Sequence, residues 1–225
     1  LSETWLKKSI KDGEVICNSN YNIYRNDKSQ LTHPSDPSNP TKYKKYGGGV
    51  LIATRSDIDA NFKRISTRRG AEIVAVEISV KEVKYIFCVV YRVGTLGQEN
   101  HKSIIDSIRP FFTGRKVKKI FILGDFNLSN VAWPCDENSQ DSFSPIEKLF
   151  VDSFCDLGLS QSIIHPTHIK GKTLDLLCTN SPELITNLTV VKNSTICKSD
   201  HYPIVFDVKA KSDFKKPPKR KIFNF

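Results

Sequence analysis

Short apolar runs of five to nine residues, separated by polar stretches, recur along the chain. They are rich in Val, Ile, Phe and Tyr, and this composition favours β-strands. The pattern predicts strands over residues 49–54, 72–80, 84–92, 119–123, 173–179 and 202–208. Apolar residues at helical spacing predict two helices, over residues 104–112 and 146–157. Because strands outnumber helices and do not alternate regularly with them, the sequence indicates an α+β fold with packed sheets.

Length and composition indicate one domain. The 225 residues suit a single large domain, which we expect over residues 1–210, followed by a basic linker over residues 211–225. No apolar run approaches the roughly 18 residues of a membrane span, and the first residues lack the apolar centre of a signal peptide. We therefore expect an intracellular protein without a membrane segment. The chain has no Met and begins with Leu, so we also expect it to be a piece of a longer reading frame.

The net charge of +10 favours a polyanionic partner such as nucleic acid, although solubility alone also explains a basic protein. The predicted linker contains six basic residues and one acidic residue, so the rest of the chain is only mildly basic. Residues 42–46 interleave basic and aromatic side chains, which can contact phosphates and stack on bases. A solvated loop fits the same residues.

One strand ends in residues that could carry chemistry. In KKIFILGDFN (residues 118–127), an apolar run leads into Gly124, followed by Asp125 and Asn127. Residues two apart can project to one side of an extended segment, so this carboxylate and amide could hold a water molecule or a metal ion. An Asx turn that closes a strand is the structural alternative.

Other polar residues stand at comparable places. Asp200 and His201 directly precede a predicted strand and could supply a metal ligand and an acid–base group. Asp175 is a carboxylate within an apolar strand and needs a partner such as a histidine. Tyr91 ends another strand, and Glu3 stands near the start of the chain. Each of these features alone also fits a turn or core packing.

The order of these motifs resembles the endonuclease/exonuclease/phosphatase superfamily, which has the DNase I-like fold. The resemblance rests on ETWL, VVYR, GDFN, TLDLL and SDHYP, and it runs from Glu3 to about Val208. The chain is most similar to the endonuclease domain of non-LTR (LINE-type) retrotransposons, through ETWL, YRND leading to GGGVLI, and PTHIKGKTLDLLCTN. The resemblance implies a four-layer α/β/β/α sandwich. In that superfamily an Asn ends a first strand ahead of ETWL, so we expect this chain to lack that strand.

The resemblance also implies Mg²⁺-dependent (or Mn²⁺-dependent) hydrolysis of a phosphodiester. Glu3 and Asp200 would hold the metal, and Asp125 would take a proton from the attacking water. The implied catalytic residues are Tyr91, Asp125, Asn127, Asp175, Asp200 and His201, with Asp175 holding the imidazole of His201. We expect DNA contacts from four basic residues: Arg25, Lys44, Lys45 and Arg92.

The function implied by the resemblance is the nicking of target DNA, to leave a 3′-hydroxyl that primes reverse transcription. The expected partners are DNA and a downstream reverse transcriptase domain of the parent polypeptide, and the expected site of action is the nucleus. Two alternatives remain open. The chain could be another phosphodiesterase of this fold, acting on abasic DNA, a phosphoinositide or a sphingolipid, or it could be a non-catalytic remnant of a retrotransposon endonuclease.

Overall fold

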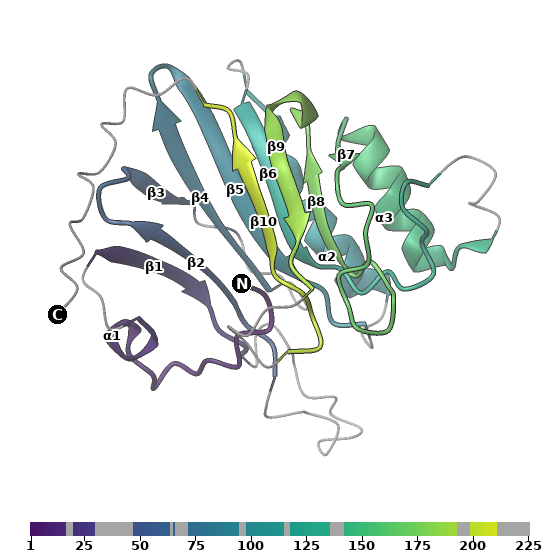
Figure 1. Ribbon diagram of the computed structural model, residues 1–225, viewed down its shortest axis with the longest axis horizontal. Helices are drawn as coiled ribbons and strands as arrows, with labels where there is room; N and C mark the ends of the chain where they lie inside the picture. The colour runs from purple at the N-terminus through teal and green to yellow at the C-terminus, as the bar shows by residue number, and fades with distance from the viewer. Residues whose placement is uncertain are drawn as a thin grey trace, which may run out of the picture.

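A six-stranded mixed sheet forms the centre of the protein (Figure 1). The computed structural model describes residues 1–16, 20–29, 47–63, 65, 72–94, 98–114, 118–135, 142–192 and 199–210. The strands of the sheet, in spatial order, are β3 (Ala60–Lys63), β4 (Glu72–Val80), β5 (Val83–Tyr91), β6 (Lys118–Asp125), β8 (Asp175–Thr179) and β7 (Ser160–Gln161). Of these pairings, β5 with β6 is parallel and the others are antiparallel.

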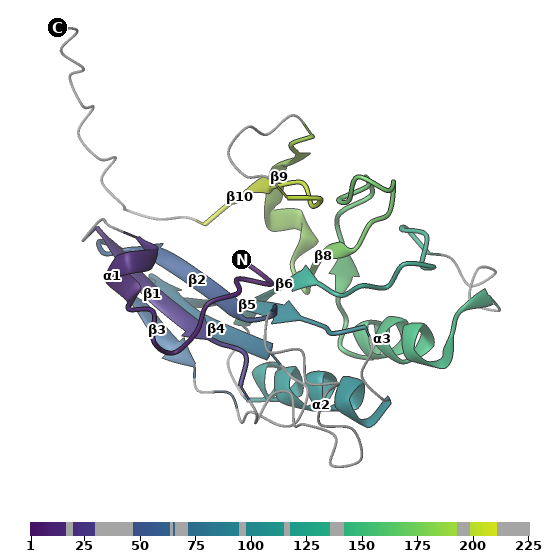
Figure 2. The ribbon, with the colours of Figure 1, turned by 90° about the horizontal axis from the view of Figure 1, so that it is seen from below.

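Helices cover one face of this sheet (Figure 2). They are α2 (Gln98–Ile108), the 3₁₀ turn η2 (Arg109–Phe112) and α3 (Pro145–Asp156). Helix α3 begins at Pro145, one residue before the predicted start, because the Ser144 hydroxyl accepts the Glu147 N–H and the Glu147 carboxylate accepts the Ser144 N–H at 2.9 Å. One continuous apolar core fills this side, centred on the aromatic rings of Phe126, Phe150 and Phe154.

Two separate strand pairs lie on the other face. Strands β1 (Tyr21–Asn26) and β2 (Val50–Arg55) form one pair, with the single turn α1 (Asp12–Val15) beside them. Strands β9 (Ile185–Val190) and β10 (Ile204–Val208) form the other, preceded by the 3₁₀ turn η4 (Pro182–Leu184). The α+β class is as predicted, and the second β-layer consists of two pairs in the part of the chain described.

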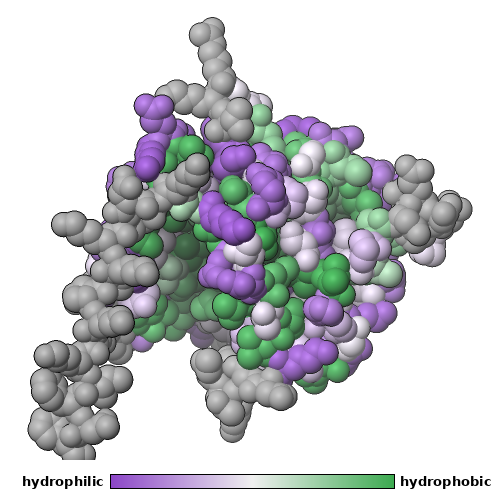
Figure 3. Space-filling model, turned by 45° about the horizontal axis from the view of Figure 1, so that its top comes forward, coloured by the Kyte–Doolittle hydropathy of each residue, from purple (hydrophilic) through white to green (hydrophobic). Residues whose placement is uncertain are grey.

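An apolar groove separates the two pairs. Two cavities of about 540 and 750 Å³ lie there, and Leu51, Val89 and Leu123 line both of them. Figure 3 shows apolar surface in a hollow of the molecule. The N-terminal segment runs along the groove beside β2, because the Leu51 N–H donates to the Leu1 carbonyl at 2.9 Å and the Thr4 N–H to the Gly49 carbonyl at 3.1 Å. The second β-layer is therefore open between its two strand pairs in the described part of the chain.

Gly124 is required where β6 ends against β5. Its φ is +131°, and a Cβ atom at this position would lie 1.8 Å from the Val90 carbonyl oxygen. Only glycine allows this approach, which brings the ends of the two strands side by side.

The sequence pattern located most strands of the central sheet and both long helices. It missed β1, β3, β7 and β9, which are short or half-exposed. None of the described helices has the length and apolar character needed to cross a membrane. The predicted domain boundary at residue 210 is not tested, because the proposed linker lies outside the described residues.

Candidate active site

Three strand ends align a row of polar side chains on the face of the sheet that carries the strand pairs. Tyr91 of β5 is in register with Asp125 of β6, and Asp125 is in register with Asp175 of β8. Directly paired residues place their side chains on the same face of a sheet. A phenol and two carboxylates therefore lie side by side, where the sequence could indicate only that each stands near a strand end.

Asp125 is buried and held by the turn that follows it. Its two carboxylate oxygens accept the backbone N–H and the side-chain Nδ2–H of Asn127, both at 2.9 Å. Asn127 has a φ of +50°, a conformation that asparagine tolerates better than most residues. Burial, reinforced by the nearby Asp175 carboxylate, raises the pKa of Asp125 to about 7. The carboxyl group can therefore exchange a proton near neutral pH.

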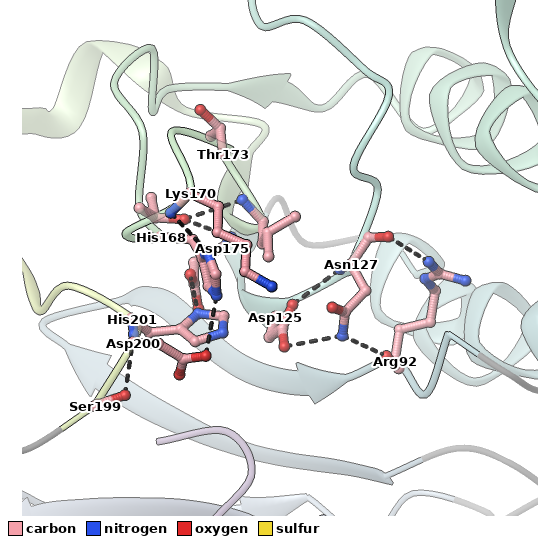
Figure 4. Close-up of polar contacts among 12 residues, drawn as sticks. Arg92, Asp125, Asn127, His168, Lys170, Thr173, Asp175, Ser199, Asp200 and His201 are labelled. Atoms are coloured by element: carbon pink, nitrogen blue, oxygen red, sulfur yellow. Dashed lines mark hydrogen bonds and ion pairs between the residues drawn. The ribbon is translucent and has the colours of Figure 1, made fainter.

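His201 contacts Asp175, as the resemblance implied. The two side chains meet at 2.7 Å between His201 Nδ1 and Asp175 Oδ2, across the space between the β10 side and the central sheet (Figure 4). This hydrogen bond is the main cause that raises the pKa of His201 to about 9. It also leaves Nε2 as the nitrogen free to face a ligand. The imidazole is therefore cationic at neutral pH and fixed in orientation.

Asp200 lies next to His201 in an exposed loop. Its carboxylate Oδ2 is 3.1 Å from Nε2 of His168, and this hydrogen bond is the main cause that lowers the pKa of Asp200. The same loop is closed by the Ser199 hydroxyl, which accepts the His201 N–H at 3.1 Å. Asp200 is thus an ionised carboxylate with one oxygen already engaged.

One cavity joins these groups with the start of the chain. It has a volume of about 330 Å³ and is lined by Ser2, Glu3, Trp5, Asp125, Asp175, Ser199, Asp200 and His201. Tyr91 borders the same region, since it is in register with Asp125. Burial raises the pKa of Tyr91, and the neighbouring Glu3 and Asp125 carboxylates raise it further. Glu3 and Trp5 have φ values of +54° and +58°, a strained backbone conformation of the kind found at ligand sites. All the predicted catalytic and metal-binding residues therefore lie in or beside one cavity.

The two arginines predicted to contact DNA both make contacts within the protein, and their contact with DNA stays a prediction. Arg92 is 5% exposed and donates to the carbonyls of Phe126 and Asn127, which fixes the turn that holds Asp125. Arg25 forms ion pairs with Asp12 and Asp27 and donates to the Ile10 carbonyl. Lys44 and Lys45 lie outside the described residues.

Sequence reasoning missed two residues that shape this site, Thr167 and His168. The Thr167 hydroxyl accepts the N–H groups of Leu174 and Asp175, both at 3.0 Å. His168 donates to Asp200, as described above. Both belong to the PTHIKGKT segment, whose composition is that of an ordinary turn, so only its place in the resemblance singled it out.

The acidic groups of the cavity fit a hard divalent cation. Glu3 and Asp200 both line this cavity, and Mg²⁺ prefers carboxylate oxygen ligands together with water. The described residues of the cavity include no cysteine, which would have favoured a softer metal.

The comparisons with known proteins agree with this geometry. The family model described as "Endonuclease-reverse transcriptase" matches residues 85–205, more than half of the chain. No curated protein matches the sequence. The solved structures with a similar fold include the endonuclease domain of TRAS1, a telomere-specific non-LTR retrotransposon, with a TM-score of 0.60 and 15% identity over 87% of this chain and 81% of that one.

Two further structures share the fold. The human Nocturnin catalytic domain with bound sulfate has a TM-score of 0.52 and 16% identity, over 91% of this chain and 79% of that one. An endonuclease/exonuclease/phosphatase family protein from Leptotrichia buccalis has a TM-score of 0.51 and 17% identity, over 88% and 74%. At these identities the structures establish the fold, while the family model establishes membership. The chain therefore belongs to the endonuclease–reverse transcriptase family, a family of phosphodiester hydrolases with the DNase I-like fold.

Proposed function

We propose that this protein hydrolyses a phosphodiester bond in one strand of DNA and leaves a 3′-hydroxyl that primes reverse transcription. One observation carries the proposal. Asp125, Asp175, Asp200, His201 and Glu3 line a single cavity, within a chain of the endonuclease–reverse transcriptase family. Hydrolysis of a phosphodiester requires a base, a positive group for the phosphoryl charge and support for the leaving oxygen. This cavity offers a group for each requirement.

Asp125 is the proposed general base. A base works best when its pKa is near the working pH, and burial raises the pKa of Asp125 to about 7. Asn127 holds both oxygens of this carboxylate and so fixes the direction in which it accepts the proton from water. The Arg92 guanidinium, which donates to the Asn127 carbonyl at 2.6 Å, supports the turn from behind.

His201 is the proposed group that binds the scissile phosphate. Its contact with Asp175 keeps the imidazole protonated at neutral pH and aims the other ring nitrogen away from Asp175. A fixed cation costs no reorganisation when charge develops on the phosphoryl oxygens. Tyr91 is the proposed donor to the phosphate or to the leaving oxygen. Its raised pKa keeps the phenol protonated at neutral pH.

Glu3 and Asp200 are the residues that would hold a divalent cation. When bound, Mg²⁺ neutralises the negative charge that accumulates on the reacting oxygens. The two acidic side chains then lie beside a polyanionic substrate without repelling it.

The proposed substrate and setting follow the family. A reverse transcriptase domain of the same polypeptide would extend the 3′-hydroxyl, and the reaction would take place in the nucleus. The DNA-binding surface is proposed to include Lys44 and Lys45, and the 60% exposed indole of Trp5 at the rim of the cavity can stack on a base or sugar.

Relaxation of supercoiled plasmid tests this proposal. In Mg²⁺ the protein should convert supercoiled plasmid to the open circular form, EDTA should stop the reaction, and a DNA polymerase should extend the nicks without prior end repair. Asp125→Asn should reduce the rate by about 10²–10⁴-fold, because it removes the base. Asp152→Asn, on the exposed side of α3, is the matched control and should leave the rate unchanged.

Two results would contradict the proposal. One is a folded protein, by circular dichroism, that leaves the plasmid supercoiled in Mg²⁺; this would favour a non-catalytic remnant. The other is an Asp125→Asn variant that nicks as fast as the Asp152→Asn control.

A further inference from the structure

His168 stands behind the cavity rather than in it. Its side chain is 8% exposed, whereas the side chain of its partner Asp200 is 61% exposed. We propose that His168 is a positioning residue, which fixes one oxygen of the Asp200 carboxylate so that the other oxygen faces a divalent cation in the cavity. This inference rests on the proposed function, because it concerns the same cation site.

The contact restrains a side chain that would otherwise be free. Nε2 of His168 and Oδ2 of Asp200 are 3.1 Å apart, the distance of an ordinary hydrogen bond. An exposed aspartate on a loop samples several rotamers, and a ligand must select one of them at an entropic cost. A donor that is buried and immobile selects the rotamer before the cation arrives.

The hydrogen bonds of His168 define it as a donor. The Lys170 N–H donates to Nδ1 of the imidazole at 3.1 Å, so Nδ1 carries the lone pair and Nε2 carries the proton. His168, Asp200 and His201 offer ligand atoms within 4.8 Å of one another, a spacing that could also suit a metal ion bound by all three. A protonated Nε2 has no lone pair for an ion. The geometry therefore assigns His168 to the carboxylate and not to the metal.

The backbone around His168 is fixed on both sides. The Ile169 N–H donates to the Asp200 carbonyl at 2.9 Å, and the Tyr202 N–H donates to the Thr167 carbonyl at 2.7 Å. The turn is closed by the Gly171 N–H, which donates to the His168 carbonyl at 2.9 Å. These bonds join the backbone of the turn to the backbone of the Asp200 loop, next to the contact between the His168 and Asp200 side chains (Figure 4).

If His168 had only a structural role, it would act through packing against His201 and not through its hydrogen bond to Asp200. The rings of His168 and His201 meet edge to face, with their centroids 4.9 Å apart. Two substitutions separate the two roles. His168→Phe keeps a ring against His201 and removes the donor, whereas His168→Gln removes the ring and keeps an amide N–H that can reach Asp200.

The test measures Mn²⁺ binding to the protein without DNA, by electron paramagnetic resonance of the free ion. His168→Phe should weaken Mn²⁺ binding by about 10–100-fold, the usual effect of losing a partner of a metal-ligating group. His168→Gln should bind Mn²⁺ close to the wild-type affinity. Thermal unfolding followed by circular dichroism checks that both variants fold.

A double variant isolates the pairwise effect. In an Asp200→Asn background, His168→Phe should cause no further loss of Mn²⁺ affinity, because the group that it positions has already been changed. The proposal is overturned if His168→Phe binds like the wild type, if Gln weakens binding as much as Phe, if the losses add, or if the wild-type protein binds no Mn²⁺. A protein that binds Mn²⁺ in this His168-dependent way but leaves plasmid intact would contradict the proposed function and keep this inference.

Discussion

The two faces of the central sheet differ in how completely they are covered. On the helical face, α2 and α3 bury one continuous core, which includes Ile120 and Ile122 of β6 and Phe150 of α3. On the other face, the apolar residues form two separate clusters, one under β1 and β2 and one under β9 and β10, with the groove between them. The charged side chains of the candidate site lie at the end of this second face.

Because of this difference, the helical face contributes most to the stability of the fold, while the second face carries the reactive groups. Burial of apolar area is the main favourable term in folding, and the helical face has the larger fully buried cluster. The second face keeps carboxylates and an imidazole near water, where a substrate can reach them. Buried charges are costly, so a site rich in them needs a rigid support that is stabilised elsewhere. The helical face supplies that support.

The largest expected effect is on activity. His201→Ala should lower the rate of plasmid nicking by about 10²–10⁴-fold, because the fixed cation for the phosphate is lost. The matched control is His165→Ala, an exposed histidine outside the cavity. Unfolding by urea should show that both variants remain folded under the assay conditions. Equal nicking rates for the two variants would show that His201 has no role in the reaction and would contradict the assignment of the chemistry to the second face.

The next effect is on stability and concerns the helical face. Phe150→Ala should lower the free energy of unfolding by about 3–5 kcal/mol, because the ring is fully buried between Phe126 and Phe154. Phe206→Ala, on the groove side, should cost only about 1–2 kcal/mol, since that ring is partly exposed. Urea unfolding measures both. A larger loss for Phe206→Ala would reverse the comparison.

The smallest effect is a pH dependence confined to the second face. Asp125 must be deprotonated to act as a base, so nicking should fall as the pH drops below about 7. His201 must be protonated to bind the phosphate, so nicking should fall again as the pH rises above about 9. We therefore expect a bell-shaped dependence of the nicking rate on pH. A bound cation should shift the acid side of this profile toward lower pH, because the cation favours the ionised form of the carboxylate. A flat profile from pH 6 to 10 would contradict both roles.

How far the sequence predicts this protein depends on what each residue must contact. Most of the strand that ends in Asp125 was predictable from its apolar run over residues 119–123, although the strand continues through Gly124 to Asp125. The need of Asp175 for a partner was predictable, because it is a carboxylate within an apolar strand, whereas the resemblance was needed to identify the partner as His201. The intramolecular contacts of Arg25 and Arg92 were not predictable. A guanidinium can serve a phosphate or a backbone carbonyl equally well, and only the fold decides between them.

The remaining gaps concern long-range pairing. His168 and Asp200 are 32 residues apart, and neither the composition nor the spacing of the PTHIKGKT segment indicates their contact. The hydrophobic pattern also did not predict that the second β-layer is divided into two pairs. Strands β1 and β9 mix apolar and polar residues and are mostly half-exposed, so they give weak strand signals.

The central claim is that the cation and the phosphate chemistry belong to the open end of the second face. Paramagnetic broadening of backbone amide resonances by Mn²⁺ tests it directly, since the effect falls steeply with distance from the ion. The account predicts that the resonances of Glu3, Asp125, Asp200 and His201 broaden first, while those of α2 and α3 stay sharp at the same Mn²⁺ concentration. Broadening that begins on the helices, or that is spread evenly over the surface, would contradict it.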